Sequence, residues 1–89
     1  MWLEQSSTLG AVERMLRRDA GRRVMQQMLT RRELQVLQLV AGGLRNGDIS
    51  NRLDITEGTV KIHMHNLYEK LGMKDRVQMA LYARDNGVV

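Results

Sequence analysis

Residues 46–71 read NGDISNRLDITEGTVKIHMHNLYEKL, and this stretch contains two helix patterns separated by a tight turn. Asn46 and Thr56 each have a side chain that can cap the first turn of a helix. Gly72, directly after the stretch, can adopt the left-handed conformation that ends one. These signals predict a short helix, a turn of about three or four residues and a longer helix.

The longer helix has one apolar residue out of place, Ile62. With about 100° between successive residues, Ile62 points away from the apolar stripe and lies among polar residues such as Lys61 and His65. Isolated apolar residues are common on protein surfaces, so exposure by chance and exposure for a function are both open at this point. The apolar stripe itself consists of Val60, Met64, Leu67 and Leu71.

Outside that stretch the sequence shows further helix patterns and no strand pattern. Thr30 and Glu33 have the spacing of a capping box at the start of a helix, which the glycines at 42–43 can end. A last helix is predicted from about Asp75 to Asn86. Besides the stripe, the expected core of this region is Leu34, Leu37, Val40, Ala41, Ile49, Leu53 and Ile55.

Residues 9–29 form an amphipathic pattern in which apolar side chains recur every four residues and arginines fill much of the remainder. Gly21 weakens this helix by about 1 kcal/mol relative to alanine. Both a structural linker helix and a dedicated binding helix fit the pattern. Residues 1–8 show no periodicity. We therefore expect a flexible leader at 1–8, a linker helix at 9–29 and one domain at 30–89.

The composition excludes several classes of protein. The chain has 89 residues, enough for one small domain, and it contains no cysteine and no proline. Without cysteine neither a disulfide nor a cysteine-based metal site can form, which fits a cytoplasmic location. No apolar run approaches the about 20 residues that span a bilayer, so we expect no membrane association. The net charge of +4 favours a polyanionic partner, although many ordinary small domains are equally basic.

Two helices joined by a tight turn are typical of a helix-turn-helix unit, whose second helix enters the major groove of double-stranded DNA. On the face opposite the apolar stripe, Lys61 can donate to guanine and Ile62 can contact a thymine methyl group. His65 can donate or accept at a base. Thr59 and Asn66 flank this face with groups that suit phosphate oxygens. This arrangement favours a function for the exposed isoleucine.

Asn46 has two interpretations. Its side chain can cap the short helix, or it can present its amide to a backbone phosphate together with the amide groups of the helix start. Arg45 and Arg52 are open in the same way, either as ordinary surface arginines or as phosphate anchors.

Catalytic and metal sites are not expected. His63 and His65 diverge by about 200° on a helix and cannot bind one ion together. Glu57 and Glu69 could form a pair of carboxylates, but no nucleophile, phosphate loop or third carboxylate lies beside them. We predict no enzyme activity, no metal, no cofactor and no small-molecule ligand.

Four stretches, LTRRELQVL, AGGLRNGDIS, ITEGTVKIH and LYEKLGMKDRVQMALYA, follow one another after Met28. Together they resemble the LuxR/NarL (GerE-type) helix-turn-helix domain of bacterial transcription regulators, over about residues 29–89. The resemblance implies an all-α domain of four helices in which 56–71 is the recognition helix. The helix at 9–29 lies where such proteins have an interdomain linker.

The resemblance also implies roles for individual residues. Its base-reading positions fall on Lys61, Ile62 and His65. The tail resembles response-regulator members of two-component systems, so the chain is either a free-standing regulator or a response-regulator output domain, with RNA polymerase as a candidate further partner. We expect phosphate contacts at Asn46, Thr56, Thr59, Asn66 and Lys70, of which the resemblance implies Thr59, Asn66 and Lys70.

Two alternatives to this function remain open. Region four of a sigma factor shares the pattern, but it usually lacks a further helix such as DRVQMALYARDNG. A protein-interaction or dimerisation module without DNA binding would have a neutral or acidic face on the recognition helix. Lys61, Thr59 and Asn66 argue against that module, whereas Glu69 and Asp54 keep it open.

The last helix is the expected dimer contact. On this helix Met79 and Tyr82 are expected to form an outward apolar pair, which a second copy related by a two-fold axis would bury. The resemblance also implies dimer contacts through this helix. The face predicted to close the core consists of Val77, Ala80, Leu81 and Arg84. The face predicted to form the homodimer consists of Met79, Tyr82, Ala83 and Asn86.

Overall fold

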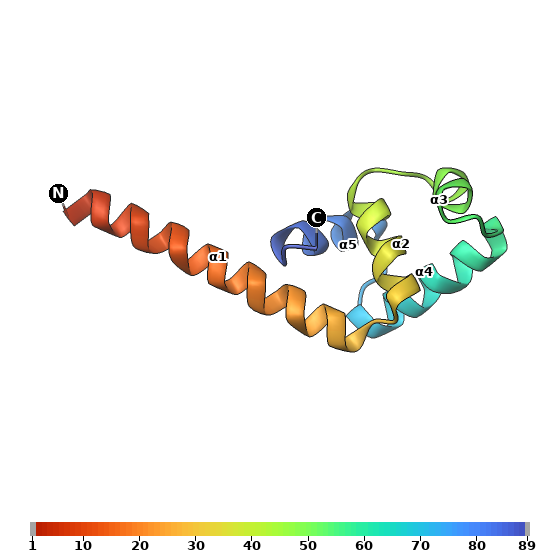
Figure 1. Cartoon of the computed structure of the whole chain (residues 1–89), viewed down its shortest axis with the longest axis horizontal. Helices are drawn as coiled ribbons and strands as arrows, with labels where there is room; N and C mark the ends of the chain where they lie inside the picture. Colours follow the sequence, from red (N-terminus) through yellow and green to blue (C-terminus); the bar gives the residue numbers. More distant parts are fainter. Residues whose placement is uncertain (1, 89) are drawn as a thin grey trace.

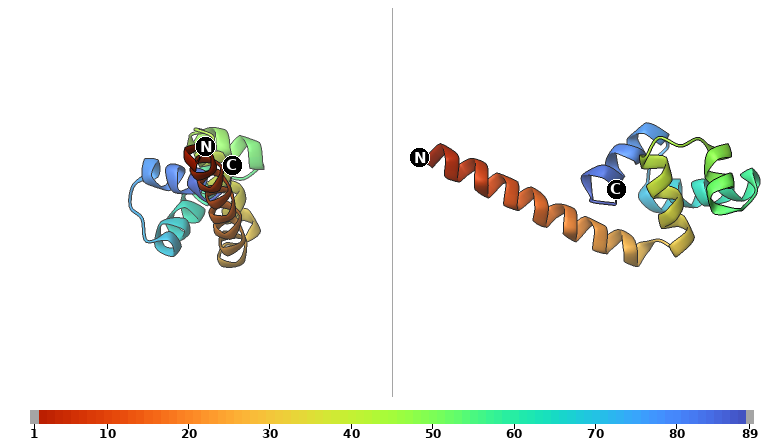
Figure 2. Two further views of the ribbon diagram at one scale, coloured as in Figure 1. Left: turned by 90° about the vertical axis from the view of Figure 1, so that its left-hand side faces the viewer. Right: turned by 45° about the horizontal axis from the view of Figure 1, so that its top comes forward.

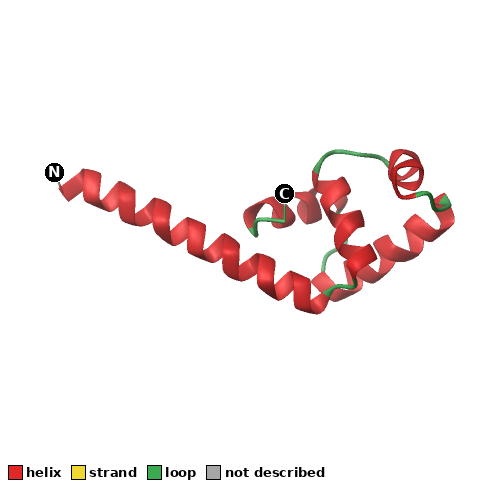
Figure 3. Ribbon diagram, in the orientation of Figure 1, coloured by secondary structure: helices red, strands yellow, loops and turns green. Residues whose placement is uncertain are grey.

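The computed structural model describes residues 2–88, with side chains from residue 9 onward, and within these residues it has five α-helices and no strand (Figures 1 and 3). The molecule measures 55 × 22 × 21 Å because α1 projects away from a bundle of the other helices (Figure 1). The all-α architecture predicted from the sequence is confirmed. The helices are α1 (Trp2–Met28), α2 (Arg31–Ala41), α3 (Asn46–Leu53), α4 (Glu57–Leu71) and α5 (Arg76–Asp85).

The helix α1 begins earlier than the sequence pattern predicts. Its amphipathic pattern starts at Leu9, but the helix starts at Trp2 and includes residues expected to form a leader. No proline interrupts the segment, and extending an existing helix costs far less than nucleating one. The apolar pattern therefore identifies the residues of α1 that are able to pack against other helices, but it does not identify the residue at which α1 begins.

Side-chain caps hold the starts of α2, α4 and α5, and those of α2 and α4 are the ones that the sequence predicts. Thr30 Oγ1 accepts a hydrogen bond from Glu33 N at 3.1 Å, and Glu33 Oε1 accepts one from Thr30 N at 2.8 Å, which completes the capping box. Thr56 Oγ1 accepts from the backbone N–H at position 59, at 3.2 Å. Asp75 caps α5 in the same way. These bonds fix where each helix begins.

The cap predicted for α3 is wrong. Asn46 is the first residue of α3, and the N-cap position belongs to Arg45, which makes no side-chain cap hydrogen bond. The physical reason is a competing donor, because Asn46 Oδ1 accepts a hydrogen bond from Arg76 Nη1 at 2.7 Å. An amide oxygen engaged with a guanidinium is not turned toward the amide groups of its own helix.

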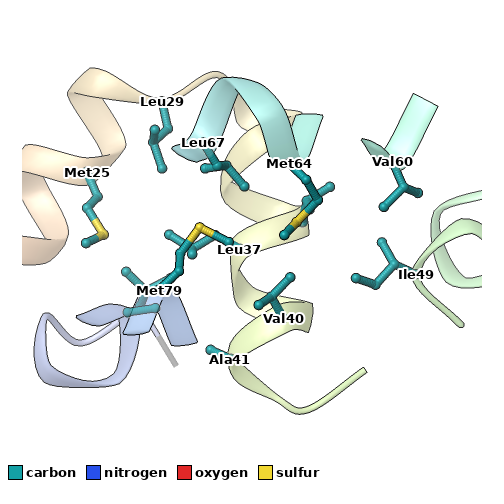
Figure 4. Close-up of a cluster of buried hydrophobic side chains, with 13 residues drawn as sticks. Met25, Leu29, Leu37, Val40, Ala41, Ile49, Val60, Met64, Leu67 and Met79 are labelled. Atoms are coloured by element: carbon teal, nitrogen blue, oxygen red, sulfur yellow. The ribbon is translucent and has the colours of Figure 1, made fainter. Parts of the chain in front are cut away.

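The core forms around α2, which packs against both α4 and α5, while α3 packs against α4 (Figure 4). Val36 was not predicted in the core, whereas the expected Leu34, Leu53 and Ile55 are only partly buried against it. The core is aliphatic and rich in methionine, as the composition predicts. Its buried members are Met25, Leu29, Val36, Leu37, Val40, Ala41, Ile49, Val60, Met64, Leu67, Met79, Ala83 and Val88.

Two residues on each face of α5 lie on the other side from the one predicted, while Tyr82 is exposed and Ala80 packs against the core as expected. Met79 and Ala83, expected in a dimer interface, are fully buried against the bundle. Val77 and Leu81, expected in the core, are exposed by 66% and 54%. The helix is anchored at its end by Arg84, whose Nε and Nη2 donate to the carbonyl oxygen of Ala41 at 3.2 and 3.0 Å.

Only the carboxyl-terminal part of α1 contacts the bundle (Figure 2). Met25 is buried, and at Gly21 the turn after α5 comes so close that an added Cβ would lie 2.8 Å from Asn86 Cβ. Opposite this docked face, Leu9 and Leu16 are each exposed by 63%. Within residues 2–88 no helix combines the length and the apolar character that crossing a membrane requires.

Candidate nucleic-acid interface

The helix α4 presents the polar face that the sequence predicts. Val60, Met64 and Leu67 are buried on its inner side. Ile62 is 61% exposed on the outer side, and its chain neighbour Lys61 is exposed with it. The structure therefore brings a cation and an aliphatic side chain together on a surface that the core does not use.

The start of α4 is narrow and carries two hydroxyl groups. Thr56 Oγ1 lies 3.0 Å from Thr59 Oγ1, so the predicted phosphate-contacting threonines are neighbours in space. A Cβ added at Gly58 would lie 3.8 Å from Thr56 Oγ1, so space remains above this turn. A backbone of this shape permits close approach by another molecule, and the N-terminal end of a helix favours negative charge.

A shallow hollow of about 320 Å³ connects the outer face of α4 with α3 and α5. Asn46 at the start of α3 lies on one side of this hollow, and Arg76 at the start of α5 lies beside it. Sequence reasoning missed Arg76 because its partners are distant along the chain. The hollow is lined by Asn46, Lys61, Met64, His65, Tyr68 and Arg76.

Lys70 does not lie free at this surface. Its Nζ donates to Glu33 Oε1 at 2.7 Å and to the carbonyl oxygen of Met28 at 3.4 Å, so it attaches α4 to α2 and to the end of α1. Its predicted phosphate contact stays a prediction, and the structure adds this bracing contact to it. Burial raises the pKa of the Glu33 carboxyl, but the hydrogen bonds from Lys70 and the Thr30 backbone, with the Lys70 charge, outweigh burial and lower that pKa below its ordinary value.

His65 lies on the exposed face with its Nε2 3.1 Å from Glu69 Oε1, a pair that is ionic only when the imidazole is protonated. His63 and Asn66 are half-buried at the two edges of that face. Among the side chains described from residue 9 onward, no group of three acidic, histidine or cysteine residues converges as a metal site would require.

The exposed side of α5 borders a second, more apolar hollow of about 430 Å³ at the seam with α2. Val77 and Leu81 line it from α5, and Val40 and Leu44 line it from the other side. Tyr82, from the predicted dimer set, is 37% exposed, while Asn86 is half-buried against α1. The surface that a second copy could cover therefore centres on Val77 and Leu81.

Comparison with known proteins gives a family match over most of the bundle. Residues 27–83 match the model of bacterial regulatory proteins, luxR family. The matched region includes α2, α3, α4 and most of α5, and it leaves out most of α1. It therefore contains all the predicted DNA-contacting residues.

Curated relatives are similar over two thirds of the chain or more. The transcriptional regulatory protein LiaR of Bacillus subtilis is 40% identical over 85 residues, which cover 96% of this chain and 40% of LiaR. The nitrate/nitrite response regulator protein NarL of Escherichia coli is 43% identical over 60 residues, 67% of this chain and 28% of NarL. The transcriptional regulatory protein LnrK of Bacillus subtilis is 48% identical over 60 residues, 67% of this chain and 27% of LnrK. The chain thus spans less than half the length of these relatives.

Proposed function

The chain belongs to the luxR family of bacterial regulatory proteins, and from this membership we propose that it binds double-stranded DNA in a sequence-specific manner as a transcription regulator. The observation that carries the proposal is the exposed Ile62 beside Lys61, on the side of α4 that faces away from the core. An exposed aliphatic residue next to a cation suits a base edge, because the major groove offers thymine methyl groups and guanine acceptors.

In the proposed complex α4 lies in the major groove. Lys61 donates to guanine O6 or N7, Ile62 contacts a thymine methyl group, and His65 donates or accepts at a neighbouring base. Backbone phosphates are contacted at the edges of this face by the side chains of Asn46, Thr56, Thr59 and Asn66, which set the position of the protein without reading sequence.

A homodimer on DNA is the second part of the proposal. Val77 and Leu81 are exposed beside an apolar hollow, and a second copy related by a two-fold axis would cover both copies of this surface. A single short helix buries too little area for a stable free dimer. Two neighbouring half-sites supply the missing affinity by raising the effective concentration.

The similarity to longer regulators suggests the setting. NarL is named a response regulator, and LiaR aligns with 96% of this chain, α1 included. We place the bundle as the output domain of a response-regulator-type protein in the bacterial cytoplasm. RNA polymerase is then a candidate partner at the promoter.

Base reading is tested with a binding site selected from random duplexes. Lys61→Ala and Ile62→Ala should each lose about 1–3 kcal/mol of discrimination between the selected site and random DNA. Asn66→Ala should weaken binding to both about equally. Gln38→Ala, exposed on α2, is the matched control and should change neither. Equal losses on both DNAs for Lys61→Ala and Ile62→Ala would assign these side chains to phosphates.

Dimerisation is tested by comparing one half-site with two. Val77→Asp combined with Leu81→Asp should leave affinity for a single half-site unchanged and abolish cooperative binding to a duplex with two half-sites. Retained cooperativity would remove the Val77–Leu81 surface from the interface.

A further inference from the structure

Arg76 connects three segments of the bundle through one guanidinium group. Its Nη1 donates to Asn46 Oδ1 at 2.7 Å, and its Nη2 donates to the carbonyl oxygen of Leu44 at 2.6 Å. The first residue of α5 is therefore attached to the first residue of α3 and to the loop before it. Arg76 is partly buried in this position, and both hydrogen bonds are side-chain contacts across about a third of the chain.

The chemistry of the two groups fixes the orientation of the Asn46 amide. A guanidinium group has donors and no acceptor, so the amide atom that faces it must be the oxygen. The Nδ2 group of Asn46, with its two hydrogens, is then directed away from Arg76. Asn46 and Lys61 line the same hollow, so the Asn46 side chain borders the surface proposed to contact DNA.

Arg45, at the N-cap, makes no side-chain hydrogen bond to the first turn of α3. The start of α3 thus offers amide donors and the positive end of a helix next to the Asn46 side chain. Two carboxylates, Asp48 and Glu57, lie around the adjoining hollow. A freely rotating Asn46 amide could turn its hydrogens toward these carboxylates. An amide held by Arg76 keeps its hydrogens available for an acceptor outside the protein.

We infer that Arg76 is a positioning residue for DNA binding, which holds the Asn46 amide with its Nδ2 hydrogens directed at a backbone phosphate. The inference rests on the proposed function and adds to it a residue that acts through another. In this account Arg76 acts through Asn46 and not by its own contact with the phosphate, since Nη1 and Nη2 each donate within the protein.

A double-mutant cycle on the selected duplex separates positioning from direct contact. Asn46→Ala should weaken binding about tenfold or more, the loss expected for one hydrogen bond to a charged group. Arg76→Met should weaken binding by a similar factor, and the double variant should be no weaker than Asn46→Ala alone. Multiplying losses in the double variant would overturn the inference, because they would mean that Arg76 acts independently of Asn46.

The salt dependence of binding provides a second readout. A side chain that neutralises a phosphate changes the slope of log affinity against log salt by about one when it is removed. Arg76→Met should leave this slope unchanged from that of the wild type. A slope that falls by about one for Arg76→Met would make Arg76 a direct phosphate contact and would overturn the positioning role.

A more conservative variant controls for the case in which Arg76→Met fails to fold. Arg76→Lys keeps the charge but cannot span both acceptors, and the side-chain amide resonances of Asn46 report directly on the anchoring. In the wild type these resonances should shift when the selected duplex is added, and in Arg76→Lys the shift should be reduced together with affinity. An unchanged shift with unchanged affinity would overturn the inference.

The two proposals fail in different ways. If Lys61→Ala weakens binding to the selected duplex but Asn46→Ala and Arg76→Met do not, the positioning role is wrong while the DNA-binding function stands. If the wild-type chain shows no preference among duplexes, the proposed function is wrong and the Arg76 role falls with it.

Discussion

The helices α4 and α5 look alike in sequence, yet only α4 presents the face that its pattern predicts. Both begin at a capping residue, Thr56 and Asp75, and both have a cation in the last turn, Lys70 and Arg84. In α4 the buried residues fall on one stripe. In α5 a nearly continuous apolar run, VQMALYA, surrounds the helix.

The difference shows what decides the orientation of a helix. In α4 the buried residues recur along one stripe, so local periodicity identifies the inner face. In α5 apolar residues occur on several sides, so periodicity alone does not identify it. Arg76 and Arg84 at the two ends attach to the carbonyl oxygens of Leu44 and Ala41, in the orientation that has Met79 inward.

The largest expected effect tests the inverted faces of α5. Met79→Ala should lower the free energy of unfolding by about 2–5 kcal/mol, because it opens a cavity in the core. Leu81→Ala, at an exposed position on the other face, should change it by less than about 0.5 kcal/mol. Urea denaturation followed by circular dichroism measures both. A greater loss for Leu81→Ala would restore the faces predicted from the sequence.

The anchors at the ends of the two helices should differ in their response to pH. Glu33 has a pKa below its ordinary value of 4.5 in the folded chain, so its stabilising contribution is present above that value and is lost as the pH falls through the folded pKa. Lys70→Met should cost about 1–3 kcal/mol at neutral pH, because it leaves a buried carboxylate without its charged donor. The cost should shrink on acidification.

Arg84→Met is the matched control for this experiment, since the acceptor of Arg84 is a backbone carbonyl that does not titrate. Its effect on the free energy of unfolding should be the same at pH 7 and at acid pH. An equal pH response of the two variants would show that Glu33 is not the titrating partner.

The carboxyl-terminal ends of α4 and α5 give a smaller contrast. An added Cβ at Gly72, which ends α4, would meet nothing within 4 Å, whereas one at Gly21 would collide with Asn86 at the end of α5. Gly21→Ala should therefore lower stability by up to about 2 kcal/mol, despite the gain of about 1 kcal/mol that alanine brings inside a helix. Asn86→Gly should restore it. A stabilising Gly21→Ala would mean that the turn moves aside freely.

The smallest expected effect concerns the caps, where the two helices should behave alike. Thr56→Ala and Asp75→Ala each remove one side-chain acceptor from the first turn, at a cost of about 1 kcal/mol. Thermal unfolding measures both. A loss at only one helix would show that the other start is held by tertiary packing instead.

Local patterns predicted most of the fold because caps and stripes act within a few residues of each other. The capping box at Thr30, the stop at Gly72 and the inner stripe of α4 are all contacts of this kind. The exposure of Lys61 and Ile62 followed directly from that stripe. Their contacts with DNA remain predictions.

Two of the contacts that the sequence did not predict join partners far apart in the chain. Lys70 pairs with Glu33 across 37 residues, and Arg76 bonds to Asn46 across 30. No periodicity within one helix reveals such pairs, so the contact of Lys70 with Glu33 and the role of Arg76 were missed. The bond from Arg76 also accounts for the absence of the predicted Asn46 cap.

The way α1 is attached has a mechanical consequence. Its carboxyl-terminal end supplies Met25 to the same core as α4, whereas Leu9 and Leu16 are exposed. A continuous helix of 27 residues is a lever about 40 Å long. A tilt of about 5° at its docked end moves the far end by about 3.5 Å. Conversely, a force applied to α1 near Leu9 exerts a torque on its contacts with the bundle. These contacts are the buried Met25 and the close approach of Gly21 to Asn86.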